Sequence, residues 1–205
     1  MQWSRIAVFA SGQGSNFAAL IAAEREGLLG GGSIELLVSD KPEAPVAQRA
    51  EDAGISSLLL RPKDFASREL YEAEIVAELQ RREIGLIVLA GYMRLITPVL
   101  LTPYAGRIIN IHPSLLPAFA GKDAMGQALN YGVKLTGVTV HFVDGGMDTG
   151  PVIAQRSLVV EDNDTATSLA DRIHKVEYEL YPEVVAALAA GRIELVGRKT
   201  IIREK

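Results

Sequence analysis

The chain has 205 residues, of which 48% are hydrophobic, and it carries a formal net charge of −4 at pH 7. This length and apolar content can bury one sizeable core, so we expect a single compact domain. The acidic balance argues against nucleic acid as a partner, and the absence of cysteine excludes disulfides, a thiol nucleophile and thiolate metal ligands.

The first half of the chain alternates short apolar runs with amphipathic segments. Runs at 6–10, 34–38, 56–60 and 86–90 predict buried parallel strands, and helices are predicted after residue 16, over 46–53 and over 67–82. This alternation predicts an α/β fold in three layers, with helices on both faces of a mostly parallel, twisted sheet. The N-terminus is not a signal peptide, and no apolar run approaches the roughly 20 residues of a membrane span. We therefore expect a cytoplasmic protein without a membrane segment.

A glycine loop, Ser11-Gly12-Gln13-Gly14-Ser15-Asn16, joins the first predicted strand to the first helix. Ser15 or Asn16 is suited to the N-cap of that helix. Bare N–H groups and the helix dipole suit a phosphate at such a loop. Phe17 stands where a dinucleotide fingerprint has its third glycine, which favours a single phosphate over a pyrophosphate; a tight turn without a ligand is the alternative. Asp40, after the second strand, is interpreted as a turn former.

The stretch from Ile108 to Pro117 carries the strongest chemical signal. Alternation in a strand places Asn110 and His112 on one face, and the prolines at 113 and 117 end the strand there. An amide beside an imidazole can polarise a carbonyl and supply a proton. A strand end with a satisfied histidine is the alternative. Because ligands of parallel sheets bind at the carboxyl ends of the strands, we expect the glycine loop, residues 91–96 and this turn to lie together.

The second half predicts a helix over 121–131, strands over 138–143 and 152–155, and a short strand or arm over 198–203. The loop 144–151 holds three glycines and two aspartates, and is either a surface turn or a loop that grips a substrate. The last helix is predicted from the cap candidate Asp164 to Tyr181, where Pro182 should break or kink it. Glu177 lies within or beside the buried stripe of this helix, where a carboxylate needs a partner or must reach water.

Together, the segments 11–16, 90–94, 110–117, 144–155 and 177–182 occur in the order and spacing of a known family. Over essentially its whole length the chain resembles the phosphoribosylglycinamide formyltransferases, folate-dependent enzymes with a Rossmann-like fold. The resemblance implies one formyltransferase domain over 1–205, with a phosphate-binding half at 1–105 and a catalytic and folate-binding half at 106–205. It implies formyl transfer from 10-formyltetrahydrofolate to the amine of 5′-phosphoribosylglycinamide in de novo purine biosynthesis.

The same resemblance assigns roles to individual residues. It makes Asn110, His112 and Asp148 the catalytic residues. It places the ribonucleotide against Gly14, Ser15, Asn16 and Glu177, and the folate against Arg68, Met93, Arg94, Leu95, Ile96, Asn110 and Asp144. His174 stands where relatives have a glutamine near the phosphate. The implied partners are small-molecule substrates, with folate as co-substrate, no metal and no nucleic acid, for a monomer or homodimer.

Four alternatives explain part of the pattern. A metal site of His112, His141 and Asp148 is disfavoured because the chain has no H-E-x-x-H pair and formyl transfer needs no Lewis acid. Formyltetrahydrofolate hydrolase resembles this architecture preceded by a regulatory domain, whereas strand one begins here near residue 6. Methionyl-tRNA formyltransferase carries a second domain and a basic surface. A non-catalytic nucleotide-binding module would leave the three candidate catalytic residues without a role.

Overall fold

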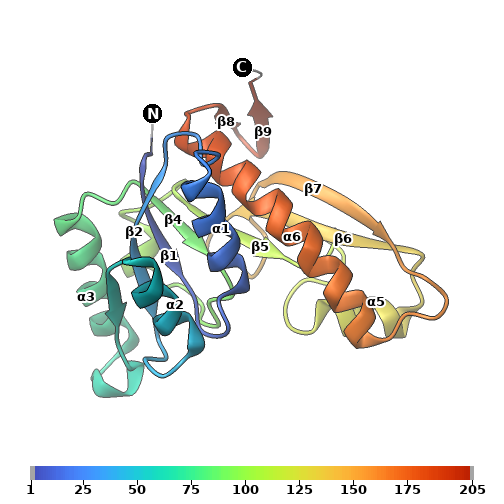
Figure 1. Cartoon of the computed structure of the whole chain (residues 1–205), viewed down its shortest axis with the longest axis horizontal. Coiled ribbons are helices and arrows are strands. Elements are labelled where there is room, and N and C mark those ends of the chain that lie inside the picture. The colour runs from blue at the N-terminus through green and yellow to red at the C-terminus, as the bar shows by residue number, and fades with distance from the viewer. Residues whose placement is uncertain (1–2, 204–205) are drawn as a thin grey trace.

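Seven strands form one central sheet in the computed structural model, which describes residues 3–203 (Figure 1). The strands are β1 (Arg5–Phe9), β2 (Ser33–Ser39), β3 (Ser57–Leu59), β4 (Leu86–Leu89), β5 (Ile108–His112), β6 (Leu135–Phe142) and β7 (Val152–Val159). Their order is β3-β2-β1-β4-β5-β6-β7. The first five are parallel, and β6 is antiparallel to both β5 and β7.

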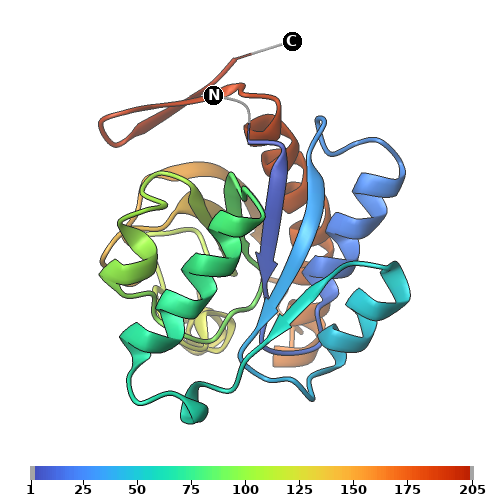
Figure 2. The same cartoon turned by 90° about the vertical axis from the view of Figure 1, so that its left-hand side faces the viewer.

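Helices cover both faces of this sheet. They are α1 (Ser15–Arg25), α2 (Pro45–Ala53), α3 (Arg68–Arg81), α4 (Pro98–Leu101), α5 (Ala124–Tyr131) and α6 (Ala166–Ala189), with a 3₁₀ turn at Pro62–Asp64. One hydrophobic cluster joins the sheet to α1, α2 and α6, and a second joins its other face to α3 and α4. Figure 2 shows α3 on one side of the sheet and α1 and α2 on the other. The predicted three-layer α/β fold with a mostly parallel sheet is therefore confirmed.

Strand β5 has the predicted alternation. Ile109 and Ile111 belong to the cluster beneath α1 and α6, whereas Ile108 belongs to the cluster beneath α3. Asn110 and His112 share the side of Ile108 because side chains alternate along a strand. The strand ends at His112, as the following proline predicts.

The prediction for the last helix was wrong at both ends. Its N-cap is Thr165, whose side chain accepts a hydrogen bond from the Ser168 N–H. Asp164 instead accepts hydrogen bonds from the Ser168 hydroxyl and from Arg172. The helix also continues through Pro182 to Ala189, because the residues at 184–189 are all buried. Burial of this apolar turn outweighs the one backbone hydrogen bond that proline removes.

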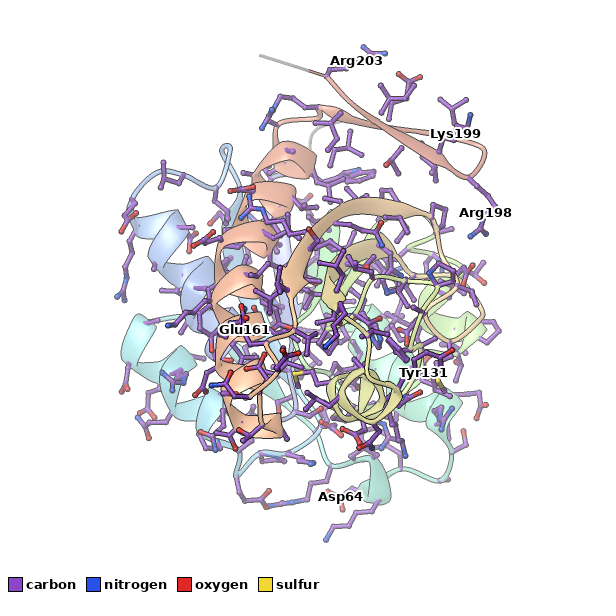
Figure 3. The ribbon with its side chains drawn as sticks, turned by 90° about the vertical axis from the view of Figure 1, so that its right-hand side faces the viewer. Asp64, Tyr131, Glu161, Arg198, Lys199 and Arg203 are labelled. Carbon is purple, nitrogen blue, oxygen red and sulfur yellow. The ribbon has the colours of Figure 1, made fainter. Side chains whose placement is uncertain are left out.

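The predicted C-terminal arm is a two-stranded hairpin, β8 (Ile193–Val196) and β9 (Lys199–Ile202). Figure 3 shows Arg198 and Lys199 at its turn, extending from the body of the molecule. The Arg198 guanidinium donates to the Thr149 carbonyl, and the Thr200 hydroxyl donates to the Val152 carbonyl, both at 2.8 Å. Among residues 3–203, none of the helices combines the length and hydrophobicity needed to cross a bilayer.

Candidate active site

The three loops expected at the carboxyl edge of the sheet do meet there. Ser11 fastens the glycine loop to the loop that follows β4: its N–H donates to the Gly91 carbonyl at 3.1 Å, and its hydroxyl accepts from the Met93 N–H at 3.0 Å. The same hydroxyl donates to the buried Asp40 carboxylate at 2.5 Å. Asp40 thus lies at the bend after β2, as predicted, and also ties two loops together.

Asn110 and His112 point into this edge beside a second histidine. Asn110 lies opposite His141 of β6 in the antiparallel register, and its Nδ2 is 3.4 Å from His141 Nε2. His112 is 6% exposed, and its Nε2 lies 2.9 Å from the Phe119 carbonyl oxygen. Since a carbonyl only accepts, we assign a hydrogen to His112 Nε2. The same reasoning assigns a hydrogen to His141 Nδ1, which lies 2.8 Å from the Phe142 carbonyl oxygen.

Asp148 completes the group from the loop between β6 and β7. Its Oδ2 lies 3.4 Å from His112 Nδ1, and its Oδ1 lies 3.6 Å from His141 Nε2. The shortest contact is with the Gly121 N–H, at 2.8 Å. Hydrogen bonding to His141 and to Gly121, with the positive charge that His112 and His141 can carry, holds the pKa of Asp148 below its ordinary value, although partial burial opposes this shift.

The contacts of His112 direct its Nδ1 at the Asp148 carboxylate. With Nε2–H held by Phe119, a neutral His112 would direct the lone pair of Nδ1 at the Asp148 carboxylate. A second proton on Nδ1 replaces that repulsion by an ion pair. The carboxylate of Asp148 and the imidazole of His112 therefore lie where a proton can pass between them.

Two adjoining cavities open onto Asn110 and Asp148. One has a volume of about 440 Å³ and is lined by Arg68, Arg94, Leu95, Ile96, His141 and Asp144 as well. The other has a volume of about 720 Å³ and is also lined by Met93, His112 and the segment 121–125. All seven candidates for folate contact thus line one or both cavities. Met93, Leu95 and Met147 are exposed hydrophobic side chains at their margin, which suits a flat apolar ligand.

The ribonucleotide candidates gather at the start of α1, outside the walls of both cavities. Asn16 Nδ2 donates to Glu177 Oε2 at 3.0 Å, while Asn16 Oδ1 is buried without a partner in the described part of the chain. Glu177 is 6% exposed, which excludes the interpretation that it reaches water. Burial raises the pKa of Glu177 above its ordinary value, although the Asn16 hydrogen bond and the positive charge that His174 and His112 can carry oppose this.

Gly14, and not Ser15 or Asn16, is the N-cap of α1. Its φ is +70°, in the region that favours glycine, and a Cβ there would lie 2.5 Å from Val46 Cγ2. The predicted cap was wrong because the packing of α2 against the loop demands glycine at the position before Ser15. Ser15 and Asn16 therefore lie in the first turn of the helix, where backbone N–H groups are free of helical partners.

Comparison with known proteins identifies the family. The family model described as formyl transferase matches residues 4–185. Over 184 residues the chain is 50% identical to the phosphoribosylglycinamide formyltransferase of Bacillus subtilis (strain 168), an alignment that covers 90% of this chain and 94% of that protein. The chain belongs to the phosphoribosylglycinamide formyltransferase branch of the formyl transferase family.

Two other relatives agree with this assignment. The crystal structure of glycinamide ribonucleotide transformylase 1 from Symbiobacterium toebii has a TM-score of 0.95 and 42% identity, covering 98% of this chain and 94% of that one. The trifunctional purine biosynthetic protein adenosine-3 of Drosophila melanogaster is 45% identical over 188 residues, which are 91% of this chain and 14% of that longer protein. The resemblance to this formyltransferase branch that the motifs predicted is confirmed.

Sequence reasoning missed His141 as a neighbour of the candidate catalytic residues Asn110 and Asp148. His141 was considered only as a metal ligand, although its strand pairs with β5 and places it opposite Asn110. The available signal was a histidine in the middle of an apolar strand, where a polar side chain needs partners. Within residues 3–203, no group of three or more histidine, aspartate or glutamate side chains is arranged to hold a metal ion.

Proposed function

We propose that this formyltransferase moves the formyl group of 10-formyltetrahydrofolate to the amine of 5′-phosphoribosylglycinamide, in purine biosynthesis. The observation that supports the proposal is that Asn110, His112 and Asp148 lie together where two cavities adjoin. Every residue considered for folate contact lines one or both of these cavities. The ribonucleotide would place its phosphate at the first turn of α1, through Ser15 and Asn16, and its ribose near Glu177. Glycine at 14 permits that turn.

The chemistry requires a donor for a developing oxyanion. The amine nitrogen attacks the formyl carbon, the carbonyl electrons move to oxygen, and the tetrahedral intermediate collapses as the bond to the folate nitrogen breaks. Asn110 can supply an N–H because its existing contact with His141 is long, at 3.4 Å. An amide donor in this position typically contributes a factor of about 10² to 10³ in rate. His112 Nε2 is engaged by the Phe119 carbonyl, so His112 contributes to oxyanion stabilisation by its field when its ring is protonated.

Proton transfer falls to Asp148. The attacking amine must lose a proton, and the folate nitrogen must gain one, so the reaction as a whole neither consumes nor releases a proton. Because its pKa is held below the ordinary value, Asp148 is a weak base that cannot retain the amine's proton for long. Asp148 therefore relays the proton toward the leaving nitrogen, while its hydrogen bonds to His141 and to the Gly121 N–H favour its ionised form. No covalent intermediate on the protein is required.

The rival functions differ in what attacks the formyl carbon. In a hydrolase, water would replace the amine, and the buried Asn16–Glu177 pair would have no substrate to meet. In a non-catalytic nucleotide-binding module, the Asn110, His112 and Asp148 group would have no chemical role. In a tRNA formyltransferase, the acceptor would be a charged nucleic acid, which the acidic chain disfavours.

One assay separates these functions. The purified protein is incubated with 10-formyltetrahydrofolate alone, with phosphoribosylglycinamide, or with charged initiator tRNA, and tetrahydrofolate release is followed. We expect release only with phosphoribosylglycinamide. Equal release without any acceptor would make the protein a hydrolase, release only with tRNA would make it a tRNA formyltransferase, and none under any condition would overturn the proposal.

A further inference from the structure

The loop at 92–97, which supplies Met93, Arg94, Leu95 and Ile96 to the two cavities, is held mainly at its ends. At one end the Met93 N–H donates to Ser11 Oγ at 3.0 Å. At the other end the Thr97 N–H donates to both oxygens of Glu72, at 2.9 and 3.1 Å. In the part of the chain that the structure describes, the backbone groups between these anchors, at 94–96, form no hydrogen bond within the protein. The placement of this loop therefore depends on its two anchors.

Glu72 is an unusual residue to find as an anchor. It lies on the second turn of α3, it is 4% exposed, and no salt bridge to it is found within residues 3–203. Its carboxylate instead accepts four hydrogen bonds: the two from the Thr97 N–H, one from the Thr97 hydroxyl at 2.6 Å and one from the Leu100 N–H at 3.3 Å. Burying a carboxylate is costly, and these donors offset the cost.

Stabilisation of the neighbouring helix α4 does not explain why the Glu72 carboxylate is buried at this cost. The helix that Glu72 caps, α4, has only four residues, and Thr97 already caps it through a hydrogen bond from the Val99 N–H at 3.2 Å. So short a helix contributes little stability of its own. What the carboxylate determines is the position at which the loop ends.

A second pair of contacts ties the same loop to the same helix. Tyr71, next to Glu72 in α3, has its hydroxyl 2.9 Å from the hydroxyl of Tyr92, and its ring lies 5.4 Å from the Arg94 guanidinium. The two anchors at the ends and these two contacts fix the loop to α3 and to the glycine loop. A rigid helix that holds a binding loop in this way restricts the geometry of the ligand site.

We propose that Glu72 is a positioning residue for the folate pocket, acting through Thr97 on the loop at 92–97. The inference rests on the proposed function, because it takes folate as the ligand of that pocket. It requires no contact between Glu72 and either substrate. Loss of the anchor should therefore weaken folate binding selectively and leave the ribonucleotide side of the site intact.

The test compares Glu72→Gln with Glu78→Gln, a control on the same helix. Glu78 pairs with Arg81 and Arg82 at the surface and is remote from the loop. A glutamine at 72 keeps one acceptor oxygen but loses the negative charge. Its side-chain NH2 would replace one of the two oxygens that accept from the Thr97 N–H. We expect the KM for 10-formyltetrahydrofolate to rise about ten-fold in Glu72→Gln, as loss of a charge-assisted hydrogen bond predicts. The KM for the ribonucleotide and kcat at saturation should stay within about two-fold, and Glu78→Gln should leave all three unchanged.

Calorimetric binding of a non-reactive folate analogue separates this inference from the proposed function. A wild-type protein that transfers no formyl group would defeat the proposed function, yet the analogue could still bind more weakly to Glu72→Gln. A folded Glu72→Gln protein with unchanged KM and analogue affinity, or with both KM values raised equally, would overturn the inference.

Thr97→Val serves if Glu72→Gln does not fold. This variant removes one donor to the carboxylate and the acceptor of the Val99 N–H, and it retains the Thr97 backbone N–H. It should weaken the analogue about three-fold, and an unchanged affinity would count against the inference.

Discussion

Replacing Asp148 by asparagine removes one charge and little else. Asp148 has φ of +55°, a conformation that asparagine tolerates better than most residues, so the loop backbone can stay in place. An asparagine Oδ1 can also accept the Gly121 N–H, the shortest contact of the present carboxylate at 2.8 Å. What disappears is the negative charge that lies 3.4 Å from His112 Nδ1 and 3.6 Å from His141 Nε2.

The size of the effect follows from that charge. Opposite charges about 4 Å apart attract by about 4 kcal/mol at an effective dielectric constant of about 20. Since about 1.4 kcal/mol is a factor of ten in rate, kcat should fall by up to about 10³. Each KM should stay within about three-fold, because the carboxylate serves proton transfer and not binding of the ground state.

Steady-state kinetics with both substrates varied would measure this, with Asp162→Asn as the control. Asp162 is exposed and pairs with Lys134 away from both cavities, so its substitution should leave kcat unchanged. If Asp148→Asn raised both KM values equally and barely changed kcat, Asp148 would be a residue that shapes the loop, and the proton-relay argument would fail.

Three further variants test the energetics of the structure. Burial raises the pKa of Glu177, so the contribution of this group to stability is present below its ordinary pKa of 4.5 and is lost as pH rises through the folded-state pKa. Glu177→Gln should therefore have a higher free energy of unfolding than wild type at pH 8, measured by urea denaturation. The KM of this variant for the ribonucleotide should rise about ten-fold. Hydrogen bonds from Arg81 and Arg82 lower the pKa of Glu78 to about 2. The contribution of these surface contacts to the free energy of unfolding, under about 1 kcal/mol, should be present above pH 4.5 and be lost as pH falls toward 2. Glu78→Gln should lack this pH dependence. Tyr181→Phe, which removes the hydroxyl that donates to the buried Leu89 carbonyl at 2.8 Å, should lower the free energy of unfolding by about 1–3 kcal/mol with both KM values unchanged; an unchanged stability would mean that this bond is not formed.

Local sequence patterns predicted the central strands β1, β4 and β5 because these are buried on both faces and read as short apolar runs. The same patterns failed where a long-range contact decides the outcome. Pro182 should end a helix, yet burial of the apolar residues at 184–189 carries α6 past it. Ser15 or Asn16 was expected to cap α1, yet Gly14 is the cap, at a position where a Cβ would lie 2.5 Å from Val46 Cγ2. No local window contains either contact.

The site was predictable to different depths. The alternation of side chains along 108–112 predicted that Asn110 and His112 share one face of β5. Asp148 comes from a glycine-rich loop that composition alone could not distinguish from a surface turn, so its proposed catalytic role came from the family resemblance. The anchors of the loop at 92–97 could not be read from the sequence, because Glu72 resembles many other helical glutamates until Thr97 is found against it.

Direct transfer is the central claim, and a single-turnover experiment with an isotopically labelled formyl group tests it most directly. The enzyme, in excess over labelled 10-formyltetrahydrofolate, is mixed with phosphoribosylglycinamide, quenched at intervals, and analysed for label on protein, acceptor amine and free formate. Direct transfer predicts that label moves to the amine in step with tetrahydrofolate release, with none on the protein. Labelled protein that forms and decays before the product, or labelled formate released without acceptor, would contradict it.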